Sequence, residues 1–466
     1  MVRDMTKGKP IKLIISFGLP LLIGNLFQQL YNMVDSSVVG HFVGKNALAA
    51  VGSTGSLMFM IMGFIIGLTS GFSIPISKYF GAGDQKNMRK CVAHSIYLTL
   101  IIAVVMTTIA VLSIENVLRL MKTPDNIFAD AYAYISIICA GISAILFYNM
   151  LAAILRAIGD SKTPLYFLML TTVLNIILDL VFVVKFSWGV KGVAIATVIS
   201  QLVSGLLCFI HIKRHFFILH LRAEDMKIDT KICKELLYTG LPMGFQMSIT
   251  ALGAIMLQSS VNALGSDIVA AVTAASRIQL MLIQPGETIG ITMATYCGQN
   301  LGAKRIDRIQ KGVNQSLLLS LAYSVGVFFV GQFAGKYIAL LFLKKSEVLV
   351  LGYVEQFLKI NSCFYPVLSV LFVYRNSLQG LGYSMPALTA GISELFARGI
   401  FGMLIVPKFG FIAVCFANPG AWIAGVLILI PVYYYVMRRI KRKYKISSKN
   451  IGNPLDSDVA SQCIIE

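Results

Sequence analysis

Four carboxylates stand inside long apolar stretches of the sequence, and they raise the question of what chemistry they serve. They are Asp35, Asp179, Glu287 and Glu394. A charged side chain at the centre of a membrane-crossing helix costs about 2.5–3.5 kcal/mol on insertion scales, and it usually marks a functional site. A carboxylate that is partly shielded from water can exchange a proton, and neighbouring oxygen atoms can help it to hold Na⁺. These positions therefore predict cation exchange.

Polar side chains recur at helical spacing around two of the aspartates. The first apolar stretch has polar residues at positions i, i+3, i+4 and i+7, which share one face of a helix: Gln28, Tyr31, Asn32 and Asp35. A later stretch places two of them four residues apart: Asn175 and Asp179. The next stretch repeats the four-position pattern: Thr197, Ser200, Gln201 and Ser204. We expect these faces, together with Asn149, to meet in one polar cluster.

Helix–helix hydrogen bonds are the plain alternative for the uncharged members of this cluster. Such a bond contributes about 0.6 kcal/mol on average within a membrane. That contribution would account for Asn149 and Thr197 on their own. It does not account for Asp35 and Asp179, so we expect these two to be functional.

The two glutamates are open to different interpretations. Glu287 follows Pro285, and a proline kink can open a polar pocket, so Glu287 either meets a cationic ligand or has a structural role. Glu394 and Arg398 are four residues apart with the acid first, which favours an internal ion pair.

The composition places the elements that carry these residues in a membrane. Apolar residues make up 57% of the chain, charged residues 13%, and the mean hydropathy is +0.77. Soluble domains have about 25% charged residues. Apolar runs of about 20 residues, each long enough to cross a bilayer, predict an all-α integral membrane protein with twelve transmembrane helices. The expected spans are 13–38, 47–72, 92–114, 127–150, 164–184, 192–212, 236–262, 269–295, 315–342, 351–374, 386–406 and 411–437.

The distribution of basic residues orients these helices. The net charge is +19, but Lys and Arg concentrate in alternate loops, beginning with the N-terminal segment. This pattern predicts an inner-membrane protein with both termini in the cytoplasm. We expect the basic stretch Arg438 to Lys445 to contact anionic lipid and not nucleic acid. The eight cysteines show no metal-ligand spacing, so neither a metal site nor a disulfide is expected.

The sequence repeats itself at a nearly constant offset. Gly18-Leu19-Pro20 returns as Gly240-Leu241-Pro242, and Gly81-Ala82 returns as Gly302-Ala303. Each half contains six predicted helices, so both halves enter the membrane from the same side as parallel repeats. We expect an N-terminal lobe at 1–212, a cytoplasmic linker at 213–234, a C-terminal lobe at 235–440 and a basic, then disordered tail at 441–466.

Several motifs in register resemble the multidrug and toxic compound extrusion (MATE) family. They are the paired Gly-Leu-Pro openings, Val-Asp-Ser-Ser-Val-Val-Gly at 34–40, Gly-Asp-Ser-Lys-Thr-Pro at 159–164, Gly-Gln-Asn-Leu-Gly-Ala at 298–303 and Leu-Gln-Gly-Leu-Gly at 378–382. The resemblance covers about residues 10–440. It implies two six-helix lobes around a central cleft and drug export driven by inward H⁺ or Na⁺.

The polar cluster is similar to that of the DinF-like branch of this family. The NorM-like branch has acids in helices 7 and 10, whereas this sequence has Gln246 and Ser369 in those spans. Coupling of transport to an ion through the second lobe is therefore in doubt.

Residues and resemblance together predict a secondary active antiporter, not an enzyme, that exports small organic cations or zwitterions and needs no cofactor. We expect cation coupling, with transient Na⁺ possible at the two aspartates, through Asp35, Asn175, Asp179 and Thr197. We expect substrate contacts from Gln28, Tyr31, Asn32, Asn149, Gln201 and Glu287. The chain is expected to be a monomer.

Two other functions fit parts of the sequence less well. A flippase for lipid-linked saccharides or other polyanions would need several basic side chains in its cleft, and few basic residues, among them Arg277, Lys359 and Arg398, fall within predicted spans. An intramembrane aspartyl protease would use Gly-Ala-Gly-Asp at 81–84, but Asp84 lies in a polar loop among basic residues.

Overall fold

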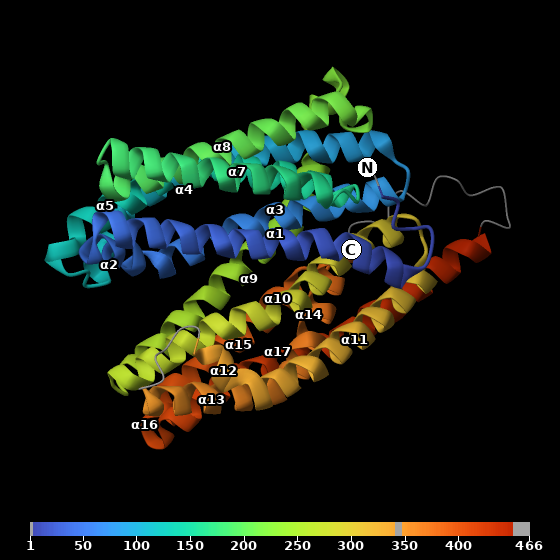
Figure 1. The fold of residues 1–466 in the computed structure, drawn as a ribbon. Coiled ribbons are helices and arrows are strands. Elements are labelled where there is room, and N and C mark those ends of the chain that lie inside the picture. Colours follow the sequence, from blue (N-terminus) through green and yellow to red (C-terminus); the bar gives the residue numbers. More distant parts are fainter. Residues whose placement is uncertain (1–2, 341–346, 451–466) are drawn as a thin grey trace.

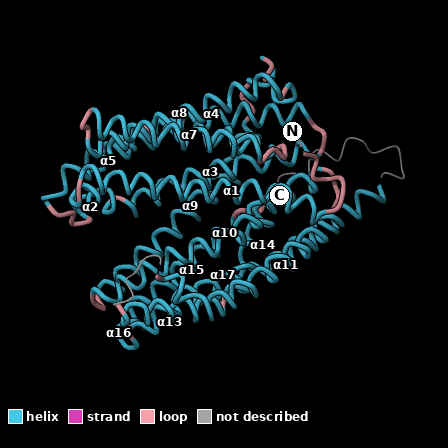
Figure 2. The backbone as a smooth tube through the Cα atoms, in the orientation of Figure 1, coloured by secondary structure: helices cyan, strands magenta, loops and turns pink. Residues whose placement is uncertain are grey.

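The chain folds almost entirely into helices joined by short turns (Figures 1 and 2). The computed structural model describes residues 3–340 and 347–450. Helices of the first half form the upper part of Figure 1 and those of the second half the lower part. The first half consists of α1 (Pro10–Val38), η1 (Val39–Val43), α2 (Lys45–Ser53), α3 (Gly55–Gly81), α4 (Gln85–Leu120), α5 (Asp125–Ala140), α6 (Ile142–Ala157), α7 (Lys162–Leu180), η2 (Val181–Lys185) and α8 (Gly189–His215).

A connecting segment with two short turns leads to the second half. These turns are η3 (Phe217–Leu219) and η4 (Ala223–Met226). The second half consists of α9 (Thr230–Asn262), α10 (Ser266–Gly302), α11 (Ile306–Phe329), η5 (Val330–Ala334), α12 (Gly335–Ala339), α13 (Val348–Cys363), α14 (Tyr365–Gly380), α15 (Met385–Ile400), η6 (Phe401–Ile405), α16 (Val406–Phe409) and α17 (Phe411–Asn450).

Helix boundaries confirm the predicted repeat. The interval from the first residue of α5 to the first residue of α13 is the same as that from α6 to α14 and that from α7 to α15. The α5–α6 pair is bent by 48° and the α13–α14 pair by 52°, so the repeat extends to the shape of the helices.

The bends fall within the predicted spans 127–150 and 351–374. Gly141 has no side chain, and the Val198 side chain of α8 occupies the space where a Cβ would lie. Pro366 stands in the first turn of α14, and its missing amide hydrogen favours the start of a new helix over the continuation of the old one. A third break, at Thr54, divides the predicted span 47–72 between α2 and α3.

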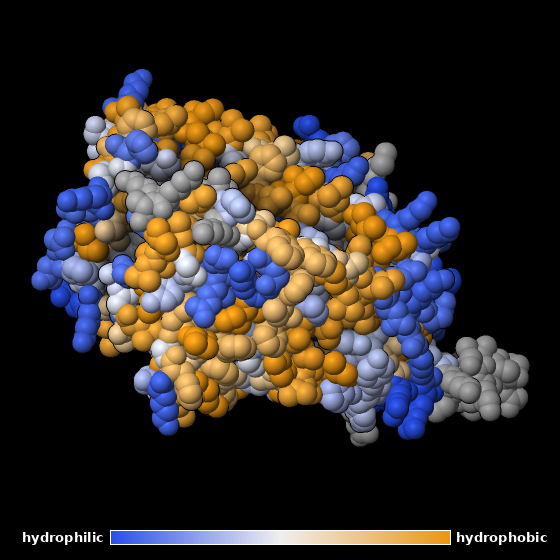
Figure 3. Space-filling view, turned by 60° about the horizontal axis from the view of Figure 1, so that its bottom comes forward, coloured by the Kyte–Doolittle hydropathy of each residue, from blue (hydrophilic) through white to orange (hydrophobic). Residues whose placement is uncertain are grey.

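The described residues contain enough apolar helix to cross a membrane repeatedly. Ten single helices are long and apolar enough, and the two bent pairs raise the number to twelve. Figure 3 shows apolar residues over the middle of the molecule and hydrophilic residues gathered toward its ends, as expected of a protein whose central band faces lipid. The twelve-helix prediction is confirmed in this form.

Small residues bring the two halves into backbone contact. The space beside Gly67 and Gly71 of α3 is filled by the main chain of α9, at Met243 and Gly240 respectively. Gly81, at the end of α3, lies in the same way against the main chain of Gln299 in α10. Close approach of this kind depends on residues without a Cβ.

The segment before α1 connects the halves at the end of the bundle near the N-terminus. The Met5 amide donates to Gln299 Oε1 at 2.9 Å, and Arg308 Nη1 donates to the Gly8 carbonyl at 2.8 Å. Gln299 Nε2 also donates to the Ala157 carbonyl of the first half at 2.8 Å. The N-terminal segment therefore belongs to the joint between the halves.

The last helix extends beyond the expected lobe boundary. α17 continues to Asn450, past the boundary expected at 440, and includes the basic stretch. Residues 451–466, part of the segment expected to be disordered, lie outside the described residues.

Candidate functional site

The two central aspartates occupy equivalent places in two packed helices. Asp35 stands one turn before η1, the π-helical turn that continues α1. Asp179 stands just before η2, the π-helical turn that continues α7. α1 packs along α7, and the two π-helical turns contact each other. Single π-helical turns occur frequently at functional sites.

The helices bring the predicted coupling residues together in a buried cluster. Asp179 and Asn175 are fully shielded, and Asp35 is 9% exposed. The Asp35 carboxyl lies close enough to Asp179 and Thr197 to interact with both. Tyr31, one turn before Asp35, lies on the same face of α1 and is 6% exposed. The helical spacing read from the sequence thus brings three separate helices to one point.

Most polar atoms of this cluster have no hydrogen-bond partner within the described part of the chain. Buried polar groups are nearly always paired, so each exception needs an explanation. The unpartnered atoms are Asp35 Oδ1, both carboxyl oxygens of Asp179, both amide atoms of Asn175, the Tyr31 hydroxyl, Ser200 Oγ and Gln201 Oε1. A bound cation or proton would satisfy the carboxyl oxygens.

The electrostatic surroundings of the two carboxyls favour a cation. Neither carboxyl forms an ion pair with a lysine or arginine in the described part of the chain, and Asp35 Oδ1 and both Asp179 oxygens accept no hydrogen bond there. Two neighbouring carboxylates repel each other, and removing them from water is costly. A proton or a metal cation would supply a countercharge to the pair.

The predicted substrate-binding residues differ in how deeply they are buried around the aspartate cluster. Gln201 is buried, 7% exposed, on the Thr197 face of α8. Gln28 is half-buried and Asn32 is exposed. Asn149 does not join the cluster as a hydrogen-bond donor: it is half-buried, and its Nδ2 donates to the Ile145 carbonyl at 2.9 Å. Because the Asn149 side chain already donates to a carbonyl of its own helix, it does not need a hydrogen-bond partner on another helix.

Tyr134 of α5 was not predicted as part of the site. It is 7% exposed and lies near both Asp35 and Asp179. It stands two residues after Tyr132 in α5, and helical spacing alone does not tell which of the two tyrosines faces the aspartates. Only the packing of α5 against α8 places it beside the carboxyls.

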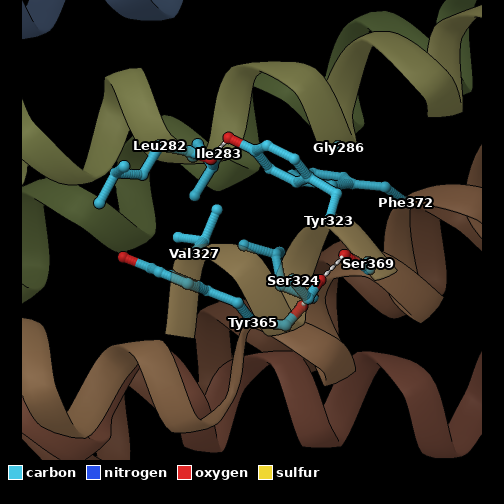
Figure 4. Close-up of a pocket in the computed structure, with 10 residues that line it drawn as sticks. Leu282, Ile283, Gly286, Tyr323, Ser324, Val327, Tyr365, Ser369 and Phe372 are labelled. Atoms are coloured by element: carbon cyan, nitrogen blue, oxygen red, sulfur yellow. Dashed lines mark hydrogen bonds between the residues drawn. The ribbon is translucent and has the colours of Figure 1, made fainter. Parts of the chain in front are cut away.

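The second half has no acid at the position equivalent to Asp35. Leu257 is buried there, and the neighbouring Gln258 is exposed and donates to Asn262 at 2.9 Å. Ser369, where the NorM-like branch has an acid, lines a small pocket with Tyr323 and shares a 2.6 Å hydrogen bond with Ser324 (Figure 4). This pocket is predominantly apolar.

Charged residues gather elsewhere in the second half. Glu394 of α15 contacts Arg375 of α14 and lies 3.7 Å from Arg398 Nη2. The predicted Glu394–Arg398 pair is confirmed, but the closer partner is Arg375, which was expected outside the spans. Glu287 is half-buried on α10 and acts electrostatically on Arg375.

The connecting segment between the halves is held to α4 by ion pairs outside the membrane-spanning segments. Arg89 Nε lies 2.8 Å from Asp225 Oδ2, and Lys90 Nζ lies 3.2 Å from Asp229 Oδ2. Burial acts to raise the pKa of Asp225, but hydrogen bonds from the Arg222 amide and from Arg89 outweigh it and hold that pKa below its ordinary value. The pKa of Asp229 is lowered, because hydrogen bonds from Lys90 and from backbone amides outweigh burial.

Comparison with known proteins decides the family. The MatE family model matches residues 20–181 and 242–404, one segment in each half, and the two together span most of the chain. The chain belongs to the MATE family. As a MATE protein it is a multi-pass membrane transporter and not an enzyme. Asp84, the residue on which a protease would depend, instead caps α4 by accepting from the Asn87 amide at 3.0 Å.

Similar proteins extend along nearly the whole length of this MATE transporter. Probable multidrug resistance protein YpnP of Bacillus subtilis is 29% identical over 84% of this chain and 86% of its own length. Probable multidrug resistance protein NorM of Thermotoga maritima is 24% identical over 90% and 89%. An outward-facing multidrug resistance MATE family transporter of the MOP superfamily has the same fold, with a TM-score of 0.86, 24% identity and coverage of 94% and 98%.

Proposed function

We propose that this MATE transporter exports small organic cations and zwitterions in exchange for inward H⁺ or Na⁺, with Asp35 and Asp179 as the coupling pair. One observation carries the proposal: two buried carboxyls lie together with unpartnered oxygens and without a basic neighbour among the described residues. Relatives named as multidrug resistance proteins support the substrate class.

The coupling mechanism is competition between cation and substrate. A cation that reaches Asp35 and Asp179 from outside neutralises them and rearranges the face of α1, which releases the substrate. Pro20 lies within α1 and lacks an amide donor, so it provides a flexible point in that helix. One inward cation gains about 2.3 kcal/mol per 100 mV, enough for roughly fiftyfold accumulation of a neutral substrate.

Several finer assignments belong to this proposal. The polar cluster and the absence of an acid at Ser369 favour the DinF-like branch over the NorM-like branch. The distribution of basic residues favours an inner-membrane location with both termini in the cytoplasm. On this orientation, the basic stretch of α17 contacts anionic lipid. The transporter is proposed to act as a monomer.

Efflux from proteoliposomes tests the proposal. Vesicles that contain the purified transporter are loaded with rhodamine 123, a cationic dye, and a pH gradient and a Na⁺ gradient are imposed separately. We expect one gradient to drive efflux in the wild type and neither to drive it in Asp35→Asn or Asp179→Asn. The matched control is Asp130→Asn, which changes an exposed aspartate in the first half of α5. Equal efflux from the wild type and the double variant would overturn the coupling scheme.

A further inference from the structure

The second half carries a buried ionic cluster where the first half carries its polar cluster. α15 is the helix that repeats α7, and Arg398 stands as far from the first residue of α15 as Asn175 stands from the first residue of α7. Glu394 corresponds in the same way to Thr171. An uncharged pair in one half is therefore a charged pair in the other.

This arginine cluster, formed by Arg375, Glu394 and Arg398, contains more positive than negative charge. The side chains of Arg375 and Arg398 are 8% and 7% exposed, and both arginines face the single carboxylate of Glu394, whose side chain is 3% exposed. Glu287 of α10 is half-buried and interacts electrostatically with Arg375 without an ion pair in the described part of the chain, so it compensates part of this excess. A buried charge in excess is strongly unfavourable unless another charge compensates it.

Two guanidinium nitrogens of the cluster have no partner among the described residues. Arg375 Nε and Arg398 Nη1 are both buried and unpaired. The remaining contacts of Arg398 are weak: Nε donates to Asn418 Oδ1 at 3.3 Å, and Nη2 lies 3.7 Å from Glu394. Each guanidinium nitrogen can form a strong, charge-assisted hydrogen bond with a carboxylate or phosphate oxygen. The unpaired nitrogens therefore indicate a ligand with acidic oxygens.

Glycines make the room for this cluster. A Cβ at Gly253 of α9 would lie 3.2 Å from both Cδ and Nη1 of Arg398. A Cβ at Gly425 of α17 would lie 3.1 Å from Glu394 Oε1. The lack of a side chain at these two glycines lets α9 and α17 pack directly against the charged groups.

We propose that Arg375 and Arg398 bind a carboxylate or phosphate group of the exported compound. The first half of the protein then receives the cationic part of a zwitterion, and the second half receives its acidic part. The two nitrogens are closed off from solvent in this conformation, so binding requires a conformation in which the cluster is accessible. This inference rests on the proposed export function and specifies its substrates.

A pair of dyes that differ only in this group tests the inference. Rhodamine 110 has a free carboxylate, and rhodamine 123 is its methyl ester. Dissociation constants are measured by fluorescence anisotropy with the full-length transporter in nanodiscs. In Arg398→Gln, which leaves one arginine paired with Glu394, we expect the affinity for rhodamine 110 to fall about tenfold, the loss of one charge-assisted contact. The affinity for rhodamine 123 should change less than twofold, which also shows that the variant is folded.

Arg277→Gln is the matched control, because Arg277 is an exposed arginine of α10 outside the cluster, and both affinities should stay as in the wild type. A second measurement uses the wild type alone: sodium benzoate should displace rhodamine 110 and leave rhodamine 123 bound. Equal losses for both dyes in Arg398→Gln, or displacement of both or neither by benzoate, would overturn the anion site. If the wild-type transporter showed no gradient-driven efflux of rhodamine 123, the export function itself would be overturned.

Discussion

Gln299 of α10 joins the two halves of the protein at the Ala157 carbonyl, to which its side-chain Nε2 donates across 2.8 Å. The same side chain accepts from the Met5 amide at 2.9 Å and is fully buried. The side-chain amide of Gln299 thus provides hydrogen-bond partners both for the Ala157 carbonyl at the end of α6 and for the Met5 amide before α1. The joint depends on contacts that neither lobe can form on its own.

Replacing Gln299 by leucine should weaken this joint. The change leaves the Met5 amide and the Ala157 carbonyl without their partner, at a cost of about 1–3 kcal/mol for each buried group. We expect a lower midpoint of thermal unfolding and faster cleavage of the N-terminal segment by added protease. The control is Gln310→Leu, at an exposed glutamine that accepts a hydrogen bond from Lys441. An unchanged cleavage rate in Gln299→Leu would contradict the assigned role.

Gly71→Ala should prevent α3 and α9 from packing as they do. A methyl group at Gly71 would overlap the main chain of Gly240, which cannot move aside as a side chain can. We expect a severe loss of folded, monodisperse protein by size-exclusion chromatography. Gly326→Ala in α11 is the control, since nothing lies within 4 Å of that Cβ position. It should fold normally and gain up to about 1 kcal/mol from helix propensity. Similar yields from the two variants would argue against the contact.

Replacement by leucine should affect the stability of the protein differently at two fully buried asparagines, Asn175 and Asn361. Both amide atoms of Asn175 are unpartnered among the described residues, so Asn175→Leu should leave the unfolding midpoint nearly unchanged or raised, yet abolish gradient-driven efflux. Asn361 donates to the carbonyls of Phe357 and Cys415 and accepts from Gln279. Asn361→Leu should therefore lose about 1–3 kcal/mol of stability through unpaired neighbours. Matching midpoints in the two variants would contradict this division.

Acidification should release the connecting segment at 216–229 before the helices unfold. The pKa of Asp225 and that of Asp229 are lowered in the folded protein, so their stabilisation is present above the ordinary Asp pKa of about 3.9 and is lost as pH falls through the lowered values. The protection of backbone amides in this segment against hydrogen exchange, relative to an unstructured chain at the same pH, should fall below about pH 4. In Arg89→Gln this loss of protection should begin at higher pH, whereas Lys86→Gln should behave as the wild type. Protection that is independent of pH in this range would exclude the ion pairs as its cause.

The sequence predicts the membrane class, the repeat and the central aspartate pair because each depends on local order. Apolar runs of sufficient length indicate helices that cross a bilayer, and a constant offset between repeated motifs indicates two copies of one fold. Asp35 and Asp179 could be predicted as neighbours because helical spacing determines which face a residue occupies, and the polar stripes left few faces to choose between.

The packing of the helices decides which side chains become partners, and helical spacing in the sequence does not predict this. Whether Asn149 turns to the cluster or to its own helix depends on competing partners, and the structure gives it the Ile145 carbonyl. Tyr134 reaches the aspartates only through the placement of α5. Arg375, just outside an expected span, becomes a buried partner of Glu394 because α14 continues to Gly380 and packs against α15. Periodicity defines the faces of single helices, whereas pairing between distant side chains is set by how the helices bend and pack in three dimensions.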